Sequence, residues 1–76
     1  MDIYKLRDNL INTIEGKVEF QSELGNRYRN EVNSITRASY YALIQYLENN
    51  ITELTSILKD VNAIIDNIEY DEYANY

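Results

Sequence analysis

The sequence predicts an all-α fold, and three observations support this prediction. The 76 residues include no proline and only two glycines, so few positions would interrupt a helix. Apolar residues recur at helical spacing and seldom alternate strictly with polar ones, as they do in strands. From about residue 28 the period is eleven residues, about three helical turns, which keeps each row on one face. The rows are Val32, Leu43, Leu54 and Ile65; Ile35, Tyr46, Ile57 and Ile68; and Leu47 and Leu58.

The first helix is expected over about residues 3–23. At about 100° per residue, its apolar residues gather on one side and its carboxylates on the other. The apolar side holds Ile3, Leu6, Leu10, Ile14, Val18 and Leu24, and the acidic face holds Asp8, Glu15, Glu19 and Glu23. Gly25 suits a left-handed residue at a helix C-terminus, and Asn26 suits the N-cap of the next helix. The sequence therefore predicts a helical hairpin with its turn at Gly25.

The second half of the chain could form one helix or two. Helices are expected over about residues 27–48 and 51–69, with a weak point at Asn49–Asn50. Asn50 suits an N-cap, and Glu53 lies three residues further on, as in a capping box. A break there predicts a monomeric three-helix bundle, whereas a continuous helix outruns its partner and predicts a dimeric helical bundle. The apolar rows keep their phase across Asn49–Asn50, which favours the long helix and the dimer.

Residues 1–69 are expected to form a single domain, followed by a frayed, acidic and tyrosine-rich tail over residues 70–76. Four carboxylates would lie at the C-terminus of the last helix, where negative charge opposes the helix dipole. They are Asp66, Glu69, Asp71 and Glu72. Such a frayed segment can become ordered when it binds a partner.

The acidic charge of the chain lies in its second half. The formal net charge is −6 at pH 7. Residues 1–38 hold six acids and six bases, whereas residues 39–76 hold seven acids and one base, Lys59. Nucleic-acid binding depends mainly on Lys and Arg against phosphate, so direct binding to nucleic acid is not expected. A larger protein with a basic surface, or mimicry of nucleic acid by the acidic face, fits the sign of this charge.

The residue types that are absent exclude most catalytic chemistry. The chain has no cysteine and no histidine, so it cannot form a disulfide, a thiolate zinc site, or a Ser–His or Cys–His pair. We expect no enzymatic activity, no catalytic residue, no cofactor and no metal site. No signal-peptide pattern is present, and no apolar run approaches the ~18 residues of a membrane span, so a cytoplasmic protein without membrane contact is expected.

Two groups of residues are candidates for partner binding besides the acidic face. The apolar stripe widens around residues 40–51, and Tyr41 projects away from it beside Arg37, as exposed tyrosines at interfaces do. The C-terminal tail adds three tyrosines at a spacing of three residues. The candidate residues are Tyr40, Tyr41, Ile44, Glu48, Tyr70, Tyr73 and Tyr76.

These features predict a small, non-enzymatic protein–protein interaction module that binds a larger, basic surface. One form of it is an inhibitor or regulator of the kind found in phages, which occupies a nucleic-acid-binding or regulatory surface. The alternative is a self-assembling helical scaffold, adaptor or assembly chaperone. A homodimer is expected, because a chain of 76 residues without disulfides or metals has only a modest core.

Overall fold

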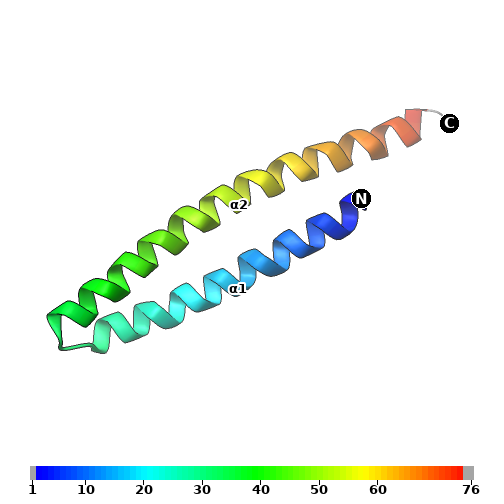
Figure 1. The fold of residues 1–76 in the computed structure, drawn as a ribbon. Helices are drawn as coiled ribbons and strands as arrows, with labels where there is room; N and C mark the ends of the chain where they lie inside the picture. The colour runs from blue at the N-terminus through cyan, green and yellow to red at the C-terminus, as the bar shows by residue number, and fades with distance from the viewer. Residues whose placement is uncertain (1, 75–76) are drawn as a thin grey trace.

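The protein consists of two long helices that lie side by side and run antiparallel (Figure 1), as seen in a computed structural model that describes residues 2–74. Helix α1 spans Ile3–Asn30 and helix α2 spans Ser34–Ala74. No strand is present in residues 2–74, which confirms the all-α class. The molecule is elongated, with extents of 64 × 18 × 15 Å, and the C-terminal end of α2 reaches past the N-terminus of α1.

Helix α1 is capped at its start by Asp2 and ends near two arginines. The Asp2 carboxylate accepts hydrogen bonds from the backbone N–H groups of Tyr4 and Lys5 at 3.0 and 3.3 Å. These bonds satisfy donors that a helix N-terminus leaves without a partner. Arg27 and Arg29 lie in the last turn of α1, where positive charge is favourable to the helix dipole. The helix expected over about residues 27–48 would instead have placed them at a helix start.

The turn predicted at Gly25 is wrong, because α1 continues through it to Asn30. No glycine has a positive φ in the described part of the chain, so Gly25 does not adopt the left-handed conformation that was expected of it at a turn. Leu24 is buried and Tyr28 is half-buried, on either side of Gly25. Burying such side chains stabilises by roughly 1.5–3 kcal/mol each, which exceeds the ~1 kcal/mol that a glycine costs in a helix.

We expect alanine at Gly16 or Gly25 to stabilise the protein. Both glycines lie inside α1, and alanine is favoured over glycine there by roughly 0.5–1 kcal/mol. A Cβ at Gly16 would meet nothing within 4 Å, and one at Gly25 would meet only Arg29 Nη1 at 3.9 Å. Urea unfolding followed by circular dichroism measures the gain. Destabilisation by Gly25→Ala alone, with Gly16→Ala as the matched control, would show that Gly25 does form a turn.

The chain reverses at residues 31–33, and Asn33 is the N-cap of α2. The Asn33 Oδ1 accepts hydrogen bonds from the backbone N–H groups of Ile35 and Thr36, both at 3.0 Å. The Asn33 backbone N–H in turn donates to Glu31 Oε1 at 3.0 Å, which ties the loop to the cap. Asn33 therefore takes the capping role that the sequence had suggested for Asn26 and Asn50.

Helix α2 runs through Asn49 and Asn50 without interruption, so the three-helix alternative is wrong. Leu47 is buried and Ile51 is half-buried, and the two stand on either side of these asparagines on the face toward α1. A break would remove one of them from that face. The helix also continues to Ala74, so residues 70–74 are helical where a frayed tail was expected.

The core is a single seam between the helices. Four side chains are buried in the part of the chain whose side chains are described: Leu24, Leu47, Val61 and Ile65. Apart from Asn50, the buried and half-buried positions of α2 are three and four residues apart in alternation, a heptad pattern typical of coiled coils. They are Tyr40, Ile44, Leu47, Ile51, Leu54, Leu58, Val61 and Ile65.

Only part of the eleven-residue repeat lies in this seam. Three successive steps of four, three and four residues along a heptad seam also span eleven residues, which is why Leu47 and Leu58, or Leu54 and Ile65, satisfy both patterns. The row of Ile35, Tyr46, Ile57 and Ile68 remains exposed in the helix pair. The physical reason is that a single helix covers only one stripe of its neighbour.

Candidate protein-interaction surfaces

The first candidate surface is an exposed apolar strip along one side of the helix pair. Leu43, Ile57 and Ile64 on α2 are 46, 48 and 49% exposed, and they fall on one heptad row beside the seam. Tyr46, which is 65% exposed, lies next to this row. Together with Phe20 of α1, these residues are named the apolar flank.

Phe20 belongs to the apolar flank by the geometry of an antiparallel pair. It precedes the seam residue Gln21 of α1 by one position, just as Leu43 precedes Ile44 of α2. In antiparallel helices, the positions that directly precede equivalent seam residues lie on the same side of the pair. Gln21 Nε2 donates a hydrogen bond to the backbone carbonyl of Ile44 at 3.3 Å, which fixes the relative register of the two helices.

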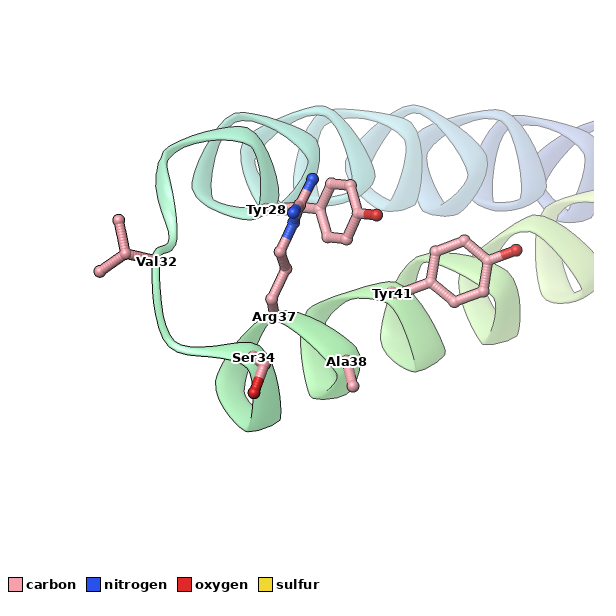
Figure 2. A pocket seen from close by; sticks show the side chains of 6 residues that line it. All are labelled: Tyr28, Val32, Ser34, Arg37, Ala38 and Tyr41. Atoms are coloured by element: carbon pink, nitrogen blue, oxygen red, sulfur yellow. The ribbon is translucent and has the colours of Figure 1, made fainter.

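The second candidate surface lies at the loop end, where Tyr28 of α1 lies against both Arg37 and Tyr41 of α2 (Figure 2). The Arg37 guanidinium carbon lies 4.5 Å from the centre of the Tyr28 ring, a cation–π contact between the helices. The ring centres of Tyr28 and Tyr41 are 6.1 Å apart. These three residues, together with Val32, Ser34 and Ala38, line an open hollow of about 420 Å³. Val32 points away from the protein.

Among the tyrosines expected to bind a partner, Tyr41 is exposed and joins this arginine–tyrosine cluster. Tyr40 is instead half-buried and lies beside Arg27. The neighbouring Tyr40 side chain, and then the hydrogen bond and charge of Glu23, raise the pKa of the Arg27 guanidinium above its ordinary value. Tyr40 therefore serves the packing of the helix pair as well as its surface.

Ile44 and Glu48 take part in the contact between the helices. Ile44 is half-buried, and its carbonyl accepts the bond from Gln21 described above. Glu48 is exposed, and its Oε2 accepts a hydrogen bond from Gln21 Nε2 at 2.8 Å. A partner that bound Glu48 would compete with this hydrogen bond.

The C-terminal turns of α2 carry exposed tyrosines beside several carboxylates. Tyr70 and Tyr73 are both largely exposed, and Tyr76 lies outside the described residues. Partial burial, followed by the charges of Glu69 and Glu72, raises the pKa of Tyr4 on α1. The N-terminus of α1 therefore lies in the negative field of the end of α2.

The acidic face of α1 points away from α2. Its four carboxylates, Asp8, Glu15, Glu19 and Glu23, are all exposed. Asp8 is paired with Arg7 at 3.4 Å and Glu23 with Arg27 at 3.0 Å. Glu15 and Glu19 have no ion pair within residues 2–74. Exposed pairs of this kind contribute little to stability, so the face is free to meet an opposite charge.

Sequence reasoning missed much of the apolar flank and of the cluster. Leu43, Tyr46 and Ile57 were assigned to the eleven-residue rows without being recognised as a separate surface, and Phe20 was not singled out. A signal for the apolar flank was present in the sequence, because Leu43, Ile57 and Ile64 are multiples of seven residues apart. Tyr28 gave no comparable signal, since its contact with Arg37 depends on where the loop lies.

The described residues contain neither a membrane-spanning helix nor a metal site. Within residues 2–74, no helix combines the length and the apolar character that crossing a membrane requires. No group of three or more carboxylate side chains that could hold a metal ion is found in the same residues. The chain matches no protein-family model, no curated protein and no solved structure, so its function is inferred from these surfaces alone.

Proposed function

We propose that this chain is a non-enzymatic protein–protein interaction module and that the apolar flank is its binding surface. The observation that carries this proposal is the row of large aliphatic side chains Leu43, Ile57 and Ile64, which remain about half exposed. Scattered exposed apolar residues are normal, but these side chains line up along one side of α2, interrupted only by Asn50 in their row, and an exposed apolar strip marks an interaction site. The heptad spacing of the row suits a helical partner.

The flank can supply binding energy without a change in the fold. Its side chains stand on the outer surface of a continuous helix, so their positions are fixed before a partner arrives. Preorganisation of this kind reduces the entropy lost on binding. Tyr46 and Phe20 add aromatic area next to the aliphatic row, and aromatic side chains are enriched in the energetically dominant parts of interfaces.

A photo-crosslinking amino acid placed at Tyr46 tests this proposal in the native cells. We expect a single crosslinked adduct of defined mass from the flank position. The matched control carries the same amino acid at Glu19, which is exposed on the opposite side of α1 from the seam. Absence of an adduct from both positions would overturn the proposal, and an adduct from Glu19 alone would move the binding surface to the acidic face.

A second candidate function is favoured by the acidic face. Its carboxylates are exposed and include two without an ion pair in residues 2–74, Glu15 and Glu19. A basic surface of a larger protein would complement them, and an inhibitor or regulator of a nucleic-acid-binding protein would act in this way. Binding of this type weakens steeply with salt, whereas binding through the apolar flank does not. The salt dependence of the crosslink therefore separates the two functions.

A further inference from the structure

We infer that the apolar flank is covered by a second copy of this chain, packed antiparallel to form a four-helix bundle. This inference rests on the proposed interaction function and names the partner of the same surface. Two copies related by a two-fold axis present the same strip to each other, so the strip has to be complementary to itself. A largely aliphatic row such as Leu43, Ile57 and Ile64 meets this requirement.

The chain exposes more surface than a compact monomer of its mass, and the excess is close to the area that a dimer interface would bury. It amounts to 6011 Å² for a protein of 9.0 kDa. A compact monomer of this mass exposes about 4,900 Å², so the helix pair exposes roughly 1,100 Å² more than a folded monomer normally does. A standard protein–protein interface buries about 800 Å² per partner. One interface along the flank would therefore bring the exposed area per chain down to the usual range.

The distribution of charge favours the antiparallel arrangement. The loop end, residues 23–41, carries the three arginines Arg27, Arg29 and Arg37 against two glutamates. The opposite end, residues 2–8 together with 60–72, carries seven carboxylates against two basic side chains. Parallel packing would place the two acidic ends side by side. Antiparallel packing instead brings each acidic end to the loop end of the other copy, where the net charge is positive.

The same arrangement gives a register for the dimer. The heptad row runs from Leu43 through Asn50 and Ile57 to Ile64, and its midpoint lies between Asn50 and Ile57. A two-fold axis at this midpoint places Leu43 of one copy opposite Ile64 of the other. Arg27 precedes the seam residue Tyr28 and so lies on the flank side of α1, and Asp71 continues the row on α2. Arg27 of one copy is then brought toward Asp71 of the second.

Engineered cysteines test this register without interference, because the natural chain contains no cysteine. Leu43→Cys and Ile64→Cys proteins are prepared separately with different tags, mixed and oxidised. A disulfide requires Cβ atoms about 3.5–4.5 Å apart, so antiparallel packing yields the mixed 43–64 product as the main species. A predominance of 43–43 and 64–64 products would show parallel packing and overturn the inference.

Sedimentation of the unmodified chain over a range of concentrations provides the second readout. We expect a monomer–dimer equilibrium that Ile57→Lys weakens at least about tenfold, because the dimer would bury an unpaired ammonium group. Thr52→Lys is the matched control, since it makes the same change of charge at an exposed position of α2 away from the flank. Circular dichroism confirms that both variants remain helical.

The outcomes for this inference and for the proposed function can be told apart. A chain that stays monomeric up to millimolar concentration would overturn the second copy as the partner. If Tyr46 then still gave a crosslink to a different protein in cells, the interaction function would stand with another occupant of the flank. Dimerisation together with an adduct of twice the chain mass would support both.

Discussion

Replacing Leu47 by alanine is expected to lower the free energy of unfolding by about 2–5 kcal/mol, which is the range for truncating a buried leucine. Leu47 is 7% exposed and is one of four buried side chains among those described. A domain of this size has a total stability of roughly 4–11 kcal/mol, so the variant loses a large part of it. Urea unfolding at a fixed protein concentration measures the change, since self-association would otherwise contribute.

Ile35→Ala is the matched control for this substitution. Ile35 is also a large aliphatic residue of α2, but it is 78% exposed. Its truncation is expected to change the stability by no more than about 0.5 kcal/mol, as at most surface positions. Equal effects of Leu47→Ala and Ile35→Ala would mean that the seam is not where the structure places it.

Proline at Asn49 is expected to destabilise the protein by about 3 kcal/mol or more. In a continuous helix, proline removes a backbone hydrogen bond and its ring clashes with the preceding turn. Had the chain broken at Asn49–Asn50, proline would fall at a helix boundary, where its effect is small. The same substitution therefore distinguishes one long α2 from two shorter helices.

Ser34→Pro is the control for Asn49→Pro. Ser34 is the first residue of α2 and directly follows the N-cap Asn33, and proline is well tolerated at this first position. We expect it to change the free energy of unfolding by less than about 0.5 kcal/mol. Thermal unfolding of both variants gives the comparison, and similar losses from the two would contradict a helix that begins at Ser34 and passes through Asn49.

The helical class and the continuity of α2 could be predicted from the sequence, because each depends on local properties. A chain without proline, with apolar rows in phase across Asn49–Asn50, has few alternatives to a long helix. The position of the reversal could not be predicted in the same way. Gly25 and Asn26 have stronger turn propensities than Glu31 and Val32, and only the pairing of the two seams decides against them.

The boundary between core and surface was also beyond local reasoning. The sequence shows which residues of α2 are apolar, but Ile57 and Leu58 are equally apolar neighbours. Leu58 is half-buried against α1, whereas Ile57 is half exposed on the flank. Which of them becomes buried depends on how many helices surround α2. Sequence periodicity alone therefore overestimates the core of a chain that presents an apolar face to a partner.

The three-residue loop between the helices has a consequence for how the protein opens and closes. Because the helices are antiparallel, sequence separation grows steadily away from the loop: Tyr28 meets Tyr41 close to the reversal, whereas Tyr4 lies near Glu69 at the other end. Closing a short loop loses less chain entropy than closing a long one. The contacts between α1 and α2 can therefore form in order from residues 31–33 outward. Separation of the two helices begins at the opposite end, where both termini lie.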